Sequence, residues 1–202
     1  DPVVSGYDWR YVGAFFRANY GYQGKYLAEF SCRYDGSSKF LPKNRWNFFW
    51  GASAGWRITE EKFMENLRDY VNELKLRASY GEVGNQNGIG RYDGIQLYNY
   101  KSNSGALLGN SKGTYVESAG LVSTVRTWER IYTYNLGIDF GFFNNRLTGT
   151  IEYYDKRTKD LIFDYTVSTN RYPYGTMTAN VGEISNKGIE LTINAPPVVT
   201  RN

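Results

Sequence analysis

Histidine is absent from the 202 residues of this chain, and Cys32 is its single cysteine. Without histidine the chain cannot supply a Ser-His-Asp triad, a histidine metal site or imidazole acid–base chemistry. One cysteine forms neither an internal disulfide nor a CxxC zinc site. The sequence also lacks an apolar run of the roughly 20 residues that a membrane-crossing helix needs, which excludes a helical membrane protein. No charged segment followed by an apolar one opens the chain, so we expect any secretory signal to lie outside these residues.

Charge of one sign is not concentrated anywhere in the sequence. The 24 Lys and Arg residues nearly match the 20 Asp and Glu residues, which leaves a net charge of +4 without a dense basic run. Binding to nucleic acid needs clustered cations that face phosphates, so we expect no nucleic-acid partner.

Catalytic and cofactor motifs are missing as well. The glycine-rich stretch 84–90 continues into Arg91 and Tyr92 rather than into the GK[ST] of a phosphate-binding loop. Carboxylates occur at 60–61 and 155–160, but nothing in the sequence places two of them in one cleft, as glycoside hydrolysis requires. We therefore expect no enzyme activity, no metal and no cofactor.

Aromatic residues, in contrast, make up 17% of the chain, and many of them follow a period of two. In 26–35, Phe30 and Tyr34 share one face, whereas Glu29 and Arg33 share the other. Such alternation is typical of a β-strand with one apolar and one polar face. Seven strands are predicted, namely Tyr11–Tyr22, Tyr26–Asp35, Asn47–Ile58, Leu74–Gly81, Trp128–Phe142, Leu147–Lys156 and Ile189–Ile193.

One face of this predicted sheet is apolar except for Arg130, which is compatible with a soluble sandwich or with a membrane barrel. Strand length favours the barrel, because several strands reach the ~9–11 residues that cross a bilayer at a tilt. Tyr and Trp on the apolar face also gather at strand ends, as they do at the headgroup level of a membrane. These end groups are Tyr20, Tyr22, Tyr26 and Trp56 at one rim and Tyr34, Trp50, Tyr80, Trp128 and Tyr153 at the other.

The connections alternate in length, which also favours a barrel with short turns on one side of the membrane and long loops on the other. Tight turns are predicted at 23–25 and at Asn144-Asn145, where both residues tolerate the positive φ of a type I′ turn. Longer links occupy about 36–46, 82–127 and 157–188. In 59–73, apolar residues at helical spacing predict a short helix at the rim of the short-turn side. The fold class is therefore all-β, an antiparallel transmembrane β-barrel segment.

The loop from Glu82 to Arg126 is the candidate for ligand binding, because connections of this length usually carry function or disorder. Tyr92, Tyr98 and Tyr100 could stack on sugar rings or on peptide side chains. The alternative is that these rings fold the loop onto itself or onto a neighbouring loop. No catalytic or metal-binding residue is predicted.

An ordered set of motifs resembles the SusC/RagA family of TonB-linked outer-membrane transporters from about residue 11 to 194. The first half carries Arg17-Ala18-Asn19-Tyr20, Lys25-Tyr26-Leu27, Asp35-Gly36-Ser37-Ser38-Lys39-Phe40, Ser53-Ala54-Gly55-Trp56-Arg57-Ile58, Leu74-Lys75-Leu76-Arg77-Ala78-Ser79-Tyr80-Gly81 and Gly84-Asn85-Gln86. The second half carries the run from Asn135 to Leu147, Tyr153-Tyr154, Thr158-Lys159-Asp160-Leu161, Asn180-Val181-Gly182 and the run from Asn186 to Leu191. Leu41 departs from the glycine expected after the DGSS-type motif, and 91–126 follows no family pattern.

The resemblance implies that residues 1–202 are part of the wall of a 22-stranded barrel closed by a plug, in the outer membrane of a Gram-negative bacterium. We expect the signal peptide, the TonB box and the plug to lie outside this chain. The implied function is TonB-dependent import of oligosaccharides or oligopeptides beneath a SusD-like surface lipoprotein. The implied partners are that lipoprotein, TonB, outer-membrane lipid and a glycan or peptide ligand. A passive porin or surface adhesin, and a soluble carbohydrate-binding β-sandwich, are the alternative functions.

Overall fold

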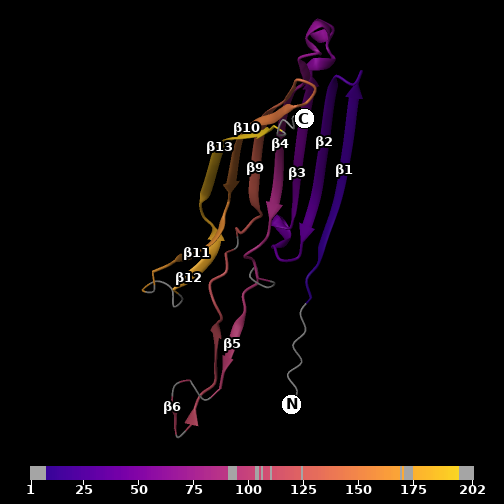
Figure 1. Ribbon diagram of the computed structural model, residues 1–202. Coiled ribbons are helices and arrows are strands. Elements are labelled where there is room, and N and C mark those ends of the chain that lie inside the picture. The colour runs from indigo at the N-terminus through magenta and orange to yellow at the C-terminus, as the bar shows by residue number, and fades with distance from the viewer. Residues whose placement is uncertain are drawn as a thin grey trace, which may run out of the picture.

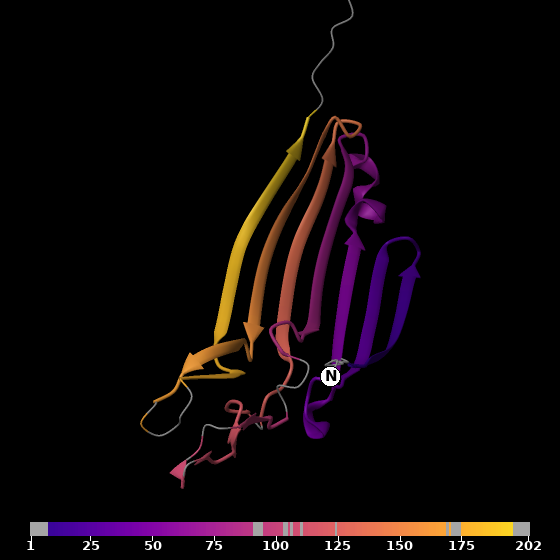
Figure 2. The ribbon, with the colours of Figure 1, turned by 90° about the horizontal axis from the view of Figure 1, so that it is seen from below.

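The chain forms one open, antiparallel, seven-stranded sheet in the order β1-β2-β3-β4-β9-β10-β13 (Figures 1 and 2). The computed structural model describes residues 8–90, 95–102, 105, 107–109, 111–123, 125–168, 170 and 175–195. The strands of the sheet are β1 (Tyr11–Tyr22), β2 (Tyr26–Ser37), β3 (Trp46–Arg57), β4 (Val71–Asn85), β9 (Glu129–Phe142), β10 (Leu147–Lys159) and β13 (Glu183–Asn194). All seven strands predicted from the alternation are confirmed, several of them with longer bounds, although the predicted end residues Ile58 and Trp128 lie just outside β3 and β9.

Tight turns join the strands at one end of the sheet, as predicted. Lys25 N donates to Tyr22 O, and the two residues between them, Gln23 and Gly24, have φ values of 53° and 69°. Asn144 and Asn145 likewise have positive φ, which suits the twist of adjacent antiparallel strands.

The link between β3 and β4 differs from the predicted amphipathic helix. It contains two 3₁₀ segments, η2 (Ile58–Glu60) and η3 (Lys62–Leu67), and the chain is already in strand β4 at Val71. Val71 pairs with Phe142 of β9, so its ladder hydrogen bonds replace those of a helix. Met64 is the buried residue of η3. No helix in the described residues is long and apolar enough to span a membrane.

Three short hairpins, which the alternation did not predict, lie within the long connections. Two of them, β5 (Tyr98–Lys101) with β8 (Tyr115–Ser118) and β6 (Leu107–Leu108) with β7 (Ser111–Lys112), belong to the link between β4 and β9. The third, β11 (Ile162–Thr166) with β12 (Thr176–Asn180), lies between β10 and β13, and η1 (Pro42–Asn44) lies between β2 and β3. Figure 1 shows β5, β6 and the β11–β12 hairpin at the end of the sheet opposite to the tight turns.

The apolar face of the sheet has no second layer of described protein against it. Phe16 is 58% exposed and Leu136 57% exposed, and Ala54 and Ile151 are also exposed. A soluble sandwich would bury this face between two sheets. The open face instead fits contact with lipid, as in a transmembrane barrel wall.

Aromatic rings mark both ends of this apolar face. Tyr26 stacks between Tyr22 and Trp56 at the tight-turn end, with centroid distances of 6.4 Å to each. At the other end, Tyr34 stacks on Trp46 at 5.1 Å. Two such bands match the aromatic girdles of membrane barrels.

Candidate functional site

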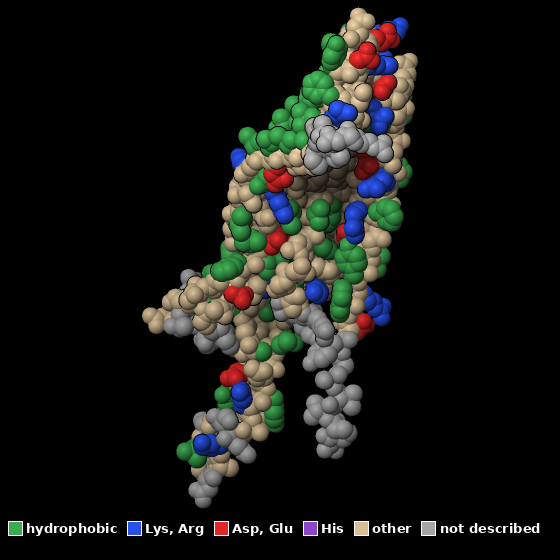
Figure 3. Space-filling model, in the orientation of Figure 1, with side chains coloured by type: hydrophobic (Ala, Val, Ile, Leu, Met, Phe, Trp, Pro, Cys, Tyr) green, Lys and Arg blue, Asp and Glu red, His purple; other side chains and the backbone are tan. Residues whose placement is uncertain are grey.

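The opposite face of the sheet is a polar wall on which charges are paired across strands. Arg77 of β4 donates from Nε to Asp139 Oδ1 of β9 at 3.3 Å and from Nη2 to Glu152 Oε2 of β10 at 2.8 Å. Thr150 also donates to Asp139 Oδ1, at 3.0 Å. Figure 3 shows cationic and anionic side chains interspersed over this part of the molecule. A wall of this kind stays hydrated and suits the lining of an aqueous lumen.

Glycine is required at one point of this wall. Gly137 is the register partner of Arg77, and a Cβ on Gly137 would lie 2.8 Å from the Arg77 guanidinium. The missing side chain lets Arg77 lie flat across β9 and reach Glu152.

Two cations of the wall face each other directly. Arg57 of β3 and Lys75 of β4 are register partners, and neither forms an ion pair within the described part of the chain. Like charges in directly opposed positions destabilise a sheet unless an anion joins them. On its other side Lys75 has Asp139 of β9 as its register partner, so a carboxylate of the same wall lies beside the pair.

The roots of the long connections pack around Trp128, which is only 2% exposed. Phe40 stacks on its ring at 4.7 Å, Phe49 lies edge-on at 5.8 Å, and Ile89 joins the cluster. The indole Nε1 donates to Arg45 O at 3.3 Å. The prediction that Trp128 belongs to the lipid-facing girdle is wrong, because the residue precedes β9 and turns under the loops. Trp128 fits the period-two alternation of 128–142, so the local sequence does not indicate that it lies outside the strand.

Arg130, near the end of β9 that bears the long connections, makes several contacts with neighbouring strands. Its Nη2 donates to Asn47 Oδ1 at 2.5 Å, and its guanidinium lies 5.8 Å from the ring centroid of Phe49. Its Nη1 is 3.7 Å from Glu82. The charge is therefore matched by polar residues at the mouth, while its register with Lys159 keeps Arg130 on the predicted face of β9.

The predicted ligand-binding tyrosines have different outcomes. Tyr92 lies outside the described residues. Tyr98 and Tyr100 both lie on β5, two residues apart and so on one face, and are 65% and 72% exposed. The opposite face of the hairpin carries the ion pair between Lys101 and Glu117, at 3.5 Å. The hairpin thus presents two open aromatic rings on one side and a charged pair on the other.

A single glutamine fixes the base of this hairpin. The amide of Gln96 donates to Leu97 O at 3.1 Å, to Gly120 O at 3.1 Å and to Ser118 Oγ at 2.5 Å. The backbone continues the ladder with Ala119 N donating to Leu97 O at 2.8 Å. The sequence did not predict these hydrogen bonds, because Gln96 lies more than 20 positions away from Ser118 and Gly120.

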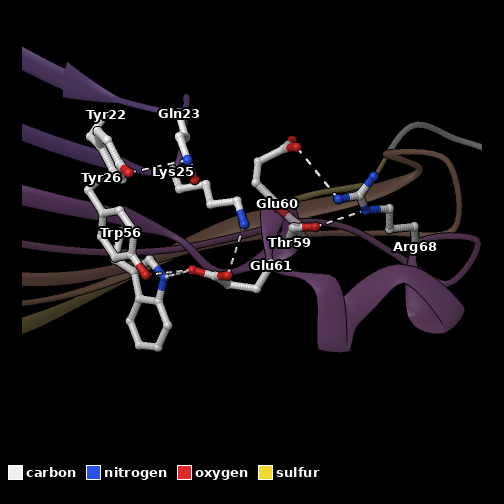
Figure 4. Close-up of polar contacts among 9 residues, drawn as sticks. All are labelled: Tyr22, Gln23, Lys25, Tyr26, Trp56, Thr59, Glu60, Glu61 and Arg68. Atoms are coloured by element: carbon white, nitrogen blue, oxygen red, sulfur yellow. Dashed lines mark hydrogen bonds and ion pairs between the residues drawn. The ribbon is translucent and has the colours of Figure 1, made fainter.

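At the opposite end of the sheet, the Glu61 carboxylate gathers three donors (Figure 4). Tyr26 Oη donates at 2.7 Å, Lys25 Nζ at 3.0 Å and Trp56 Nε1 at 3.2 Å. These hydrogen bonds, led by the one from Tyr26, lower the pKa of Glu61 below its usual 4.5. The contacts fasten the β1–β2 turn and the aromatic girdle to the η2–η3 segment.

Comparisons with known proteins agree with this geometry. The family model described as "TonB dependent receptor-like, beta-barrel" matches residues 3–197. The chain is 35% identical over 199 residues to TonB-dependent receptor SusC of Bacteroides thetaiotaomicron, a match that covers 95% of this chain and 19% of that protein. It is 33% identical over 206 residues to TonB-dependent receptor P26 of Formosa agariphila, with 99% and 20% covered.

A solved structure of the RagAB peptide importer in its closed-closed state aligns with a TM-score of 0.79 and 26% identity, covering 95% of this chain and 20% of that one. The RagAB peptide transporter aligns at 0.76 with 28% identity, covering 92% and 20%. The chain therefore spans about a fifth of the length of the relatives it matches.

Proposed function

Because the chain belongs to the TonB-dependent-receptor β-barrel family, whose members are outer-membrane transporters, we propose that it is a wall segment of an active importer in the outer membrane of a Gram-negative bacterium. The observation that carries this proposal is the division of one sheet into an exposed apolar face and a paired, charged face. The first face suits lipid and the second suits a hydrated lumen.

The rest of the importer is supplied by parts of the protein beyond this segment. We propose that they include the remaining strands of a closed barrel, a plug and a TonB box, since the segment covers about a fifth of its relatives.

The substrate class is an oligosaccharide or an oligopeptide, taken up with a surface lipoprotein partner. The likeness to the RagAB peptide importer supports the peptide alternative. The two exposed tyrosines of β5 fit either ligand, because aromatic rings stack on sugar rings and on peptide side chains alike. In this proposal they contact the ligand at the outer mouth, and the protein has no enzyme activity.

Uptake by the full-length protein tests energy coupling. Cells that express it should accumulate a labelled peptide or glycan pool, and deletion of TonB should abolish that accumulation. Uptake that persists without TonB would favour a passive porin instead. Purification from membranes in mild detergent, followed by mass spectrometry, should recover a lipoprotein partner together with a bound glycan or peptide.

A further inference from the structure

The lipid-facing side of β10 changes abruptly from apolar to charged. Ile151 and Tyr153 are exposed on this face, and the next positions with the same orientation are Asp155, Arg157 and Lys159. Asp155 lies within the predicted strand Leu147–Lys156, so the prediction that Arg130 is the single charge on the apolar face is wrong. These positions lead to the end of β10 that bears the long connections. In membrane barrels that end faces the cell exterior, so the change marks the headgroup level of the outer leaflet.

The charges at this level form a cluster with its cations outermost. Asp155 Oδ2 accepts from Arg157 Nη2 at 2.8 Å and lies 3.3 Å from Lys187 Nζ of β13. The Asp155 side chain is only 10% exposed, whereas those of Arg157 and Lys187 are 41% and 50% exposed. Glu183, opposite Lys159 in register, is the second carboxylate of the cluster.

Both outer cations keep donors for a further anion. A guanidinium has five N–H groups and an ammonium has three. Arg157 donates from Nε and Nη2 to Asp155, and the Lys187 ammonium forms an ion pair with the same carboxylate. Arg157, Lys159 and Lys187 thus lie near two carboxylates, Asp155 and Glu183, and Asp155 contacts two of the three cations. Arg130, the register partner of Lys159 on β9, is matched by Glu82.

An apolar groove begins directly below this cluster. Tyr153 and Ile189 are register partners one step below Asp155 and Lys187, and they line one end of a shallow groove of about 670 Å³. Its lining continues past Leu136 and over Ala78, and it reaches Tyr26 and Trp56 in the opposite girdle. The groove therefore crosses the apolar band, with the cationic cluster at its outer end.

We propose that this surface binds a phosphate-bearing lipid of the outer leaflet, with the phosphate on Arg157 and Lys187 and an acyl chain in the groove. Charge complementarity selects the phosphate, and the adjoining groove selects a lipid over a free anion. The inference rests on the membrane placement proposed above, but not on import or on its substrate.

Native mass spectrometry of the delipidated full-length protein in detergent tests the proposal, with lipid A and dephosphorylated lipid A as probes. The unmodified protein should prefer the phosphorylated form, and inorganic phosphate should not displace it. The variant Asp155→Asn/Arg157→Gln/Lys187→Gln, which leaves no unpaired carboxylate behind, should bind lipid A roughly 30-fold more weakly, at roughly fivefold per basic residue. Asp155→Asn alone should retain binding.

Lys156→Gln is the matched control, since Lys156 lies on the polar face of the same strand, and it should leave lipid binding unchanged. If the triple variant fails to fold, Lys187→Gln alone keeps the Asp155–Arg157 bond and should still lose roughly fivefold. Equal binding of both lipid A forms, or equal loss in Lys156→Gln, would overturn the proposal. A protein that remains soluble without detergent would instead refute the membrane placement.

Discussion

Arg77 and Glu152 form an ion pair of 2.8 Å although β9 lies between their strands. The contact spans three strands because Gly137 leaves the space above β9 open. Together with the bond from Arg77 to Asp139, it ties β4, β9 and β10 together on the polar side. Asp139 and Glu152 are partly buried and share the Arg77 guanidinium. Without that cation, the two negative charges would repel each other.

Replacement of Arg77 by Leu should therefore destabilise the barrel by about 1–2 kcal/mol, because Asp139 and Glu152 lose their shared partner. Thermal unfolding of the full-length protein, followed by the gel shift of heated and unheated samples, measures the effect. Arg17→Leu is the control, since its ion pair with Glu29 is more exposed and should cost less than about 0.5 kcal/mol. Equal losses in both variants would show that the three-strand bridge adds nothing.

Replacement of Trp128 by Ala should remove the centre of the cluster that holds the loop roots. Loss of a buried Trp typically costs about 3–5 kcal/mol, and here the opening should be local to the outer mouth. Limited proteolysis should then cut the connection between β4 and β9 faster, while the sheet remains folded. Phe163→Ala, at an exposed position of β11, should leave the cleavage rate unchanged.

The double variant Tyr98→Ala/Tyr100→Ala should weaken ligand binding without loss of folded protein, because both rings are open to solvent. Loss of stacking at two positions should lower affinity about tenfold. Isothermal titration with the co-purified peptide or glycan measures this change. Asn99→Ala, on the other face of the same strand, should bind as the unmodified protein does; unchanged affinity in the tyrosine variant would remove these rings from the site.

The tight-turn rim should loosen in acid. Because the folded pKa of Glu61 lies below its unfolded value near 4.5, its contribution is complete above that value and disappears as pH falls through the folded pKa. Hydrogen exchange of the 58–70 segment should accelerate over that interval. In Glu61→Gln this pH dependence should vanish, whereas Glu65→Gln should keep it.

Much of the sheet follows from local sequence. The alternation in 26–35 and 147–156 placed each side chain on a face, and the Asn144-Asn145 pair predicted its turn correctly. The apolar spacing in 59–73 predicted a helix that the structure does not contain. Part of this segment belongs to strand β4, because Val71 pairs with Phe142, a residue far away in the chain. The small hairpins also escaped prediction, since their strands are too short to show a period.

By itself the sequence determined the strands, their two faces and the family, because side-chain alternation and turn preferences are local properties of the chain. Only the tertiary structure decided that Trp128 lies beneath the loops and that Arg77 reaches Glu152. It also decided that Lys187 joins Asp155 above an apolar groove. These arrangements depend on which strands become neighbours and on their register, and strand pairing is a long-range property that no short stretch of residues contains.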